Sequence, residues 1–142
     1  MANAVRIGVQ GDGEWLGFDL RAVMRAVGPH ADLRWSLSDV EFNCDVTPVW
    51  PEGTQAVQEA SQQAQGFPLD WEAMDRLADT CNQIIDGRFV GYDDSGRPQL
   101  MLLADDSTYW IVWATSTDVL DAVRSAFAGV EDYPEPAPSG HN

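Results

Sequence analysis

Residues 84–113 read IIDGRFVGYDDSGRPQLMLLADDSTYWIVW, and this stretch decides the fold. It contains three runs of apolar, β-branched and aromatic residues, separated by turn-forming residues at 93–98 and 105–108. Runs of this kind joined by short turns predict an antiparallel meander of strands. The runs at 99–103 and 109–113 are apolar on both faces, so we expect them at the centre of a sheet that helices cover on at least one side.

Three other segments, 19–28, 70–85 and 117–127, repeat apolar residues at the spacing of an amphipathic helix. Asp19 and Asp70 begin the first two, where a side-chain oxygen can accept a hydrogen bond from the first helical turn. Gly28 and Pro29 end the first segment. These segments predict about three helices packed against the sheet.

The N-terminal half predicts further strands. Residues 4–9 alternate apolar with small or polar side chains and run into a Gly-rich turn. Residues 33–46 also alternate, but the phase reverses near Ser38–Asp39, and a strand changes its buried face only at a turn or bulge. Residues 47–66 predict a long loop with one marginal helix at most. The expected fold class is therefore α+β, with an antiparallel sheet built from N-terminal strands and the C-terminal meander.

One domain is expected to span residues 1–133. Hydrophobic residues make up 44% of the 142-residue chain, which suffices for a folded core and exceeds what a disordered acidic chain contains. No internal repeat is visible. Beyond Gly129 the chain carries three Pro residues, so we expect it to fray there, with residues 134–142 as a flexible Pro-rich tail.

The charge of the chain is its second strong feature. It has 23 acidic and eight basic side chains, and the formal net charge is -15. An excess this large goes beyond what solubility requires and predicts a basic partner. It also repels polyanions, which excludes direct nucleic-acid binding. Every basic residue is Arg, so the chain has no lysine for a phosphate-binding loop or a Schiff base.

The sequence also bears on compartment. No apolar run approaches the roughly 20 residues of a membrane span, and residues 1–10 lack the pattern of a signal peptide. We therefore predict a cytoplasmic protein without a membrane partner. Cys44 and Cys81 lie far apart, each within an apolar pattern, and this placement predicts two free thiols that behave as small hydrophobes.

No catalytic or metal-binding motif is present. The two histidines, His30 and His141, have no companion at motif spacing, and a zinc site would need three or four clustered ligands. The sequence therefore predicts no enzyme activity, no metal and no cofactor. An enzyme that uses Asp or Glu is kept as an alternative, and it would need a deep pocket with at least two carboxylates of strongly shifted pKa.

The preferred contact surface is an acidic row on the second half of the 33–46 segment. Asp39, Glu41 and Asp45 occupy alternate positions there, so a continuous strand would place all three carboxylates on the face away from the core. Trp50, in the loop that follows, is the aromatic residue least explained by a periodic core pattern. We interpret it as a contact anchor, or as a plug that closes the loop over the core.

Two pairs of acidic residues complete the candidate contact set. Asp93–Asp94 and Asp105–Asp106 occupy the two turns of the meander. Asp is common in turns because its side chain bonds the local backbone, so plain turn chemistry is the alternative to partner contact. The pair at 93–94 does not match the spacing of a calcium-binding loop.

The runs QIIDGRFVGY at 83–92 and DDSTYWI at 105–111, with a closing helix that ends at Phe127, carry a resemblance. Over Leu69–Val130 the chain resembles small acidic immunity proteins of bacterial polymorphic toxin systems. The resemblance implies a single α+β domain that binds one cognate toxin domain in a 1:1 complex and neutralises it. It implies no particular contact residue, and the oligomeric state stays open.

The charge and the resemblance point to the same class of partner. A toxin domain that handles nucleic acid has a basic cleft, and an acidic inhibitor is attracted to such a cleft and can fill it. The main alternative is a mimic of DNA that blocks a DNA-binding enzyme. A mimic would compete with DNA for several unrelated proteins, whereas an immunity protein would bind a single partner.

Overall fold

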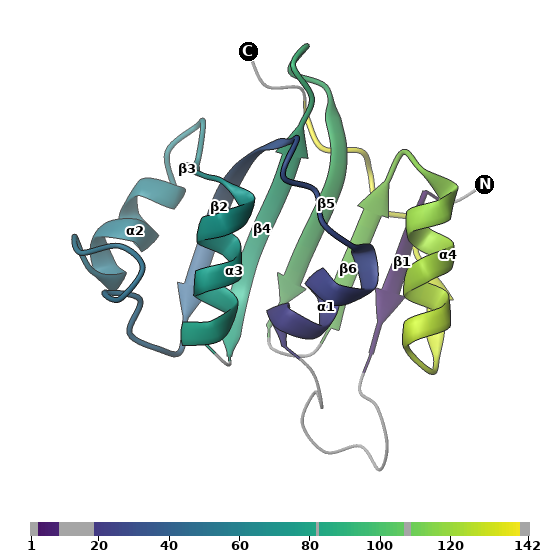
Figure 1. Ribbon diagram of the computed structural model, residues 1–142, viewed down its shortest axis with the longest axis horizontal. Coiled ribbons are helices and arrows are strands. Elements are labelled where there is room, and N and C mark those ends of the chain that lie inside the picture. Colours follow the sequence, from purple (N-terminus) through teal and green to yellow (C-terminus); the bar gives the residue numbers. More distant parts are fainter. Residues whose placement is uncertain (1–2, 9–18, 82, 107–108, 140–142) are drawn as a thin grey trace.

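The computed structural model describes residues 3–8, 19–81, 83–106 and 109–139, which form four helices and one seven-stranded sheet (Figure 1). All neighbouring strands are antiparallel, in the order β3-β2-β4-β5-β6-β1-β7. The strands are β1 (Ala4–Ile7), β2 (Arg34–Phe42), β3 (Phe67–Leu69), β4 (Ile84–Tyr92), β5 (Pro98–Asp105), β6 (Tyr109–Ala114) and β7 (Val130–Asp132). The helices are α1 (Leu20–Val27), α2 (Thr54–Ser61), α3 (Trp71–Thr80) and α4 (Thr117–Ala126).

The meander is confirmed, and β5 lies at the centre of the sheet. Val90, Met101 and Trp113 stand side by side on β4, β5 and β6, so the three strands are in register across the sheet. The α+β class and the antiparallel sheet are confirmed as well. The sheet has more strands and the chain more helices than the sequence predicted, because β3, β7 and the complete helix α2 gave no strong periodic signal.

Helices α1, α3 and α4 lie over one face of the sheet, and α2 lies beside β2 and β3 at one edge (Figure 1). The main core lies between these layers. Leu37, Phe89 and Leu102 of the sheet are fully buried against apolar residues such as Met74 and Leu77 of α3. No helix in the described part of the chain is both long enough and apolar enough to cross a membrane.

The opposite face of the sheet carries a second apolar cluster. Its buried members are Ala4, Val90, Met101, Ile111 and Trp113, and Tyr133 packs against them. The C-terminal segment crosses this face (Figure 1): the Tyr133 amide donates to the Ala4 carbonyl, and Pro138 lines a hollow together with Val90.

The prediction that the chain frays beyond Gly129 is wrong for Val130–Asp132, which form β7 and pair with β1. The salt bridge from Arg6 to Glu131, at 2.7 Å, ties these two edge strands together. The flexibility of 134–142 stays a prediction, and residues 140–142, with His141, lie outside the described part of the chain.

A bulge in β2 is confirmed where the phase of the sequence reverses. The register with β4 shifts between Ser38 and Glu41, and Asp39 adopts a positive φ of 51°. The prediction of a strand that continues to residue 46 is wrong, because β2 ends at Phe42. The chain beyond that residue leaves the sheet and turns toward α2, so strand alternation no longer decides where its side chains point.

Both predicted helix caps are confirmed. The Asp19 carboxylate accepts from the Ala22 amide at 3.3 Å, and the Asp70 carboxylate accepts from the Ala73 amide at 2.8 Å. Helix α3 ends at Thr80, five residues before the predicted end, since the Ile pair that extends the apolar stripe belongs to β4. The Gly-rich turn predicted after the first strand, and positions 107–108 of the second meander turn, lie outside the described residues.

The prediction of two free thiols is wrong. Cys44 and Cys81 form a disulfide, with Cα atoms 5.5 Å apart and a sequence separation of 37. Their spacing matches no motif, because the fold alone brings the end of β2 next to the end of α3.

Candidate functional site

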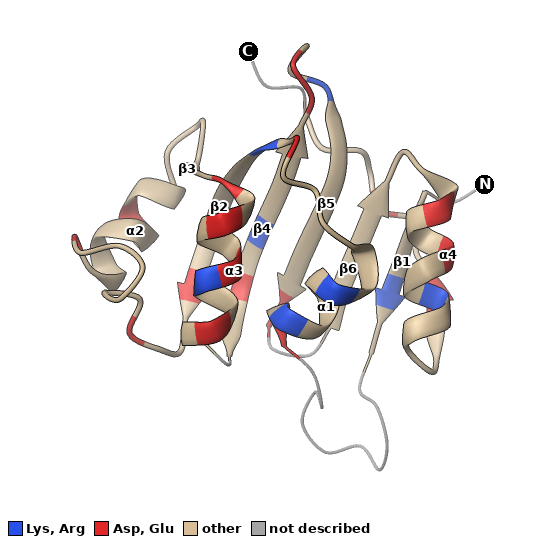
Figure 2. Cartoon of the chain, in the orientation of Figure 1, with Lys and Arg blue, Asp and Glu red and all other residues tan. Residues whose placement is uncertain are grey.

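Carboxylates from three neighbouring strands gather at one end of the sheet. Figure 2 shows acidic residues where β2, β4 and β5 reach the lower edge of that view. We call this set the acidic end, and its members are Asp39, Glu41, Asp86, Asp105 and Asp106.

The antiparallel register builds the acidic end. Glu41 of β2 stands opposite Asp86 of β4, and the pairing of Gly87 with Ala104 brings Asp86 next to Asp105 of β5. The bulge in β2 allows Asp39 and Glu41 to lie on the same side of the sheet, away from the helices. Three strands thus supply adjacent carboxylates although Asp39 and Asp105 have a sequence separation of 66.

The acidic end is open to solvent. Asp39, Glu41, Asp105 and Asp106 are exposed, and Asp86 is partly exposed while its Oδ1 accepts from the Asp106 amide at 2.8 Å. Among the ion pairs of the described residues, none involves Asp39, Glu41, Asp86 or Asp105. The negative charge of these side chains is therefore directed at solvent or at a partner.

A hollow of about 330 Å³ lies within the acidic end. Asp39, Asp86 and Asp105 line it, with Arg88 and Leu103 between them. In the described part of the chain, no group of three or more His, Cys, Asp or Glu has the arrangement of a metal site. The hollow is thus a solvated concave surface with an apolar patch and one guanidinium among three carboxylates.

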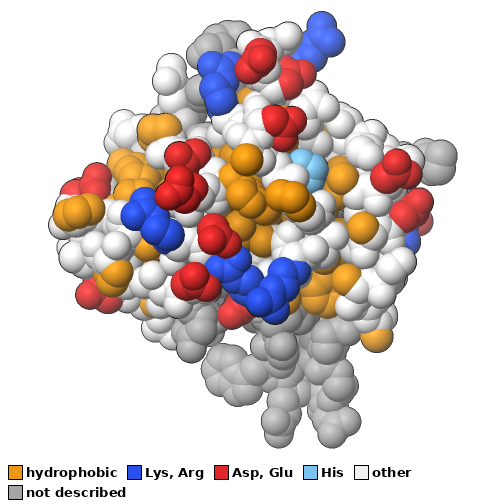
Figure 3. All heavy atoms as spheres, in the orientation of Figure 1, with side chains coloured by type: hydrophobic (Ala, Val, Ile, Leu, Met, Phe, Trp, Pro, Cys, Tyr) orange, Lys and Arg blue, Asp and Glu red, His pale blue; other side chains and the backbone are white. Residues whose placement is uncertain are grey.

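Other Arg side chains pair with carboxylates outside the acidic end. Arg21 of α1 bonds Asp75 and Asp79 of α3, and Arg124 of α4 bonds Asp121 and Asp132. Figure 3 shows the result on the helix-covered face, where acidic and basic side chains intermix. Acidic residues on that face are partly compensated by Arg, whereas the acidic end has Arg88 alone along its hollow.

Asp45 does not belong to the acidic end, so the predicted row of three is wrong. Beyond the end of β2, its carboxylate accepts from the Thr47 amide at 3.0 Å and from the Thr47 hydroxyl at 2.5 Å. The hydroxyl hydrogen bond, followed by the amide hydrogen bond, lowers the pKa of Asp45 below its ordinary value. This carboxylate stabilises a local turn.

Trp50 is buried, with 9% of its surface exposed. Its ring meets the Phe67 ring edge-on, with centroids 5.2 Å apart. The backbone amides of Val49 and Trp50 both donate to the Val46 carbonyl, so the loop folds back over the core. Of the two interpretations of Trp50, this position favours the plug that closes the loop.

Asp93 and Asp94 lie at the opposite end of the sheet from the acidic end (Figure 2). The Asp93 carboxylate accepts from the amides of Ser95 and Arg97 at 2.8 and 3.0 Å and from the Gln99 side chain at 3.1 Å. It is therefore a turn residue. Asp94 is exposed and far from the other candidate carboxylates.

Sequence reasoning missed Asp86 and the disulfide. Asp86 follows two Ile residues that resemble the end of a helix, so its position on β4 opposite Glu41 was hidden. The signal that could have found it is the pairing of 84–92 with the strand at 33–42, whose acidic residues would then share one edge.

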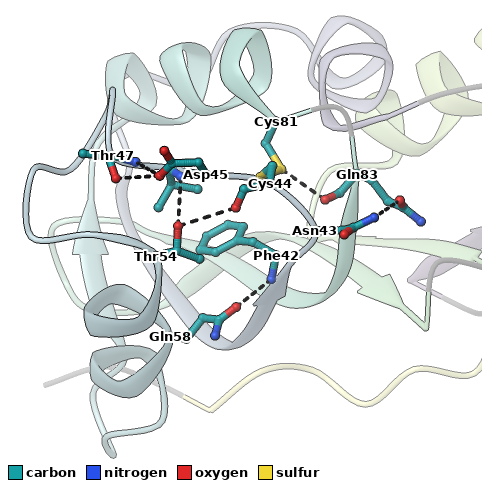
Figure 4. The surroundings of a disulfide bond; sticks show 10 residues. Phe42, Asn43, Cys44, Asp45, Thr47, Thr54, Gln58, Cys81 and Gln83 are labelled. Carbon is teal, nitrogen blue, oxygen red and sulfur yellow. Dashed lines mark hydrogen bonds between the residues drawn. A yellow bond between two sulfur atoms is a disulfide. The ribbon is translucent and has the colours of Figure 1, made fainter.

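The disulfide joins Cys44, two residues beyond the end of β2, to Cys81, and Figure 4 shows its surroundings. Between Cys44 and the end of β2, the Asn43 amide donates to the Gln83 carbonyl at 3.2 Å, and its side-chain amide donates to the Gln83 side chain at 2.6 Å. On the other side, the Phe42 amide donates to Gln58 of α2 at 2.9 Å. Phe42 at the end of β2 is thus bound to α2, while the next two residues are bound to the loop before β4 and covalently to Cys81 at the end of α3.

Comparisons with known proteins assign no relative. No protein-family model, no curated protein and no solved structure matches this chain. What the protein can bind therefore follows from its own surface and charge.

Proposed function

We propose that this protein is an immunity-type inhibitor that binds one basic protein partner, a bacterial toxin domain, through the acidic end. The observation that carries the proposal is the set of four carboxylates on β2, β4 and β5, those of Asp39, Glu41, Asp86 and Asp105, none of which is in an ion pair within the described residues. The resemblance of Leu69–Val130 to immunity proteins supports the same class.

Electrostatics explains what such a surface contributes. The net charge of -15 and the local gathering of carboxylates attract a basic cleft over a long range and orient the encounter. Steering of this kind raises association rates by roughly ten- to a thousandfold at low salt. Rapid capture suits an inhibitor that must reach its target before the target acts.

Charged rims add rate and specificity, and most of the affinity of a complex comes from a few apolar or aromatic anchors. Trp50 is buried and does not serve this purpose. Leu103 and Tyr109 are partly exposed beside the acidic carboxylates, since Tyr109 pairs with Asp105 across the β5–β6 ladder. We assign them the anchoring contacts.

The mimic of DNA is the alternative function. A mimic must follow the regular spacing of phosphates along a groove, whereas these carboxylates gather around one hollow of about 330 Å³. Carboxylates that gather around one hollow favour a compact contact with a single partner protein over the extended binding site of a DNA-binding enzyme.

Co-purification with the product of the adjacent gene tests the proposal. We expect a 1:1 complex at low salt that weakens at high salt. Asp39→Asn combined with Asp105→Asn should reduce capture, and Asp32→Asn combined with Asp94→Asn is the matched control, because it removes the same charge at the opposite end of the sheet. If the product elutes unbound at both salt concentrations, the proposal fails.

The cytoplasmic location predicted from the sequence does not enter this proposal. A disulfide between Cys44 and Cys81 persists in oxidising compartments, and the reducing cytoplasm opposes it. Whether this bond is formed when the protein meets its partner therefore depends on the compartment in which the two meet.

A further inference from the structure

The end of the β2–β4 ladder is its weakest part. Beyond the bulge at Asp39, only two residue pairs remain, Glu41 with Asp86 and Phe42 with Ile84. Bulges interrupt ladder hydrogen bonds, and like charges placed directly opposite each other destabilise strand pairing. The acidic end therefore contains both features in adjacent positions, and something else must hold these residues together.

The disulfide closes the chain at this weak end. Cys44 follows Phe42 by two residues, and Cys81 precedes Ile84 by three, so the covalent bond lies directly past the last ladder pair (Figure 4). It also connects to helix α3, because Cys81 is the C-cap residue of that helix. In this stretch, the two strand ends are held together by the disulfide, by the Asn43 hydrogen bonds, by the hydrogen bond from the Phe42 amide to Gln58 and by the burial of Phe42 and Ile84 in the core.

We propose that the Cys44–Cys81 bond is a redox clamp on the acidic end. When oxidised, it holds the end of β2 against the start of β4 and keeps Glu41 beside Asp86. When reduced, the repulsion between these carboxylates separates the two strand ends, and the partner surface loses its arrangement. Its consequence for partner binding rests on the proposed function, whereas the clamp itself does not.

The exposure of the two cysteines indicates which sulfur atom a reductant attacks first. Cys81 is buried, with 1% exposed, whereas Cys44 is partly exposed. The thiolate of a cellular dithiol attacks the Cys44 sulfur and displaces the Cys81 thiolate, which takes up a proton. The second thiol of the dithiol then attacks the mixed disulfide, releasing the Cys44 thiolate, which is also protonated. The dithiol leaves as a disulfide, so two electrons have passed to the protein.

The clamp implies that the protein binds its partner in an oxidising environment. In a reducing environment, the ends of β2 and β4 separate and binding weakens. A bond of this kind forms and persists where thiol reductants are scarce. The partner would accordingly be neutralised outside the reducing cytoplasm, or only after the clamp has been oxidised.

Amide hydrogen exchange on the full chain, with and without a phosphine reductant, tests the clamp. We expect exchange in 41–45 and 83–86 to become roughly tenfold faster or more on reduction, while the centre of β5 and β6 stays protected. The double variant Cys44→Ala, Cys81→Ala should exchange as fast as the reduced protein, and its exchange should not change when the reductant is added. Unchanged exchange on reduction would overturn the clamp, as would alkylation of both cysteines in protein purified without reductant.

A nona-arginine peptide at low salt probes the link to binding. We expect the oxidised protein to bind it several-fold more tightly than the reduced protein. Equal binding by both forms would overturn redox control of the surface. Binding by neither form, together with faster exchange on reduction, would support the clamp and contradict the proposed function.

Discussion

Glu41 lies directly opposite Asp86 in the antiparallel register of β2 and β4, one pair before the ladder ends. Two carboxylates in such positions repel each other, so the fold carries an arrangement that its own stability does not favour. Proteins retain unfavourable local features mainly at functional sites. This relationship links the stability of the sheet end to the partner surface proposed for it.

Replacing Glu41 by Gln should therefore stabilise the protein and weaken partner binding at the same time. The substitution removes the repulsion with Asp86, and we expect the free energy of unfolding to rise by a few tenths of a kcal/mol. Urea unfolding measures that change. Asp94→Asn, at the other end of the sheet, serves as the control and should change neither quantity. A loss of stability in Glu41→Gln would contradict the repulsion.

Removal of the disulfide should have a larger effect. The bond closes a loop with a sequence separation of 37 residues, and the Cys44→Ala, Cys81→Ala double variant should lose about 4 kcal/mol of unfolding free energy. Urea unfolding of the oxidised, reduced and double-variant proteins measures this. A difference of less than about 1 kcal/mol would show that the closed loop stays restrained without the bond.

Alkaline pH should destabilise the protein through Tyr92. Burial raises the pKa of the Tyr92 hydroxyl above its ordinary value, and the charge of Arg88 lowers it in part. The neutral hydroxyl is thus favoured in the folded state. This contribution to stability is complete below the unfolded pKa and is lost as the pH rises through the folded pKa. Tyrosinate absorbance should show a late titration step that disappears in Tyr92→Phe; an identical titration curve for the variant would contradict this assignment.

Tyr133→Ala should weaken the second apolar cluster. The ring packs beside buried residues of the sheet face opposite the helices, and the Arg6 guanidinium lies 5.3 Å from its centroid. Partial loss of this burial should cost roughly 1–2 kcal/mol of unfolding free energy. Tyr133→Phe retains the ring and should lose far less. Equal losses in both variants would place the effect in the hydroxyl and not in the packing.

The periodic parts of the sequence predict most of the fold. The meander, three helices, both Asp caps and the bulge near Asp39 follow from local spacing, because burial imposes a period on those residues. Helix α2 and the short strands β3 and β7 lack such a period. Phe67–Leu69 and Val130–Asp132 become strands through pairing with β2 and β1, which is a tertiary effect.

The candidate site was only half predictable for the same reason. Asp39, Glu41 and Asp105 are acidic residues on or next to strands, so their exposure follows from alternation. Their adjacency depends on the strand order β2-β4-β5, which brings in Asp86 and leaves Asp45 behind. The disulfide could not be predicted either, since no local pattern shows that the end of β2 and the end of α3 lie side by side.

The association rate with the co-purified partner tests the central claim most directly. We compare wild-type protein, Asp39→Asn with Asp105→Asn, and the control Asp32→Asn with Asp94→Asn, each at low salt. Asn suits the positive φ of Asp39, so the bulge should persist in the first variant. The acidic end predicts a roughly tenfold slower association for the first variant and little change for the control. Equal rates for the two variants would contradict the assignment of the partner surface to the acidic end.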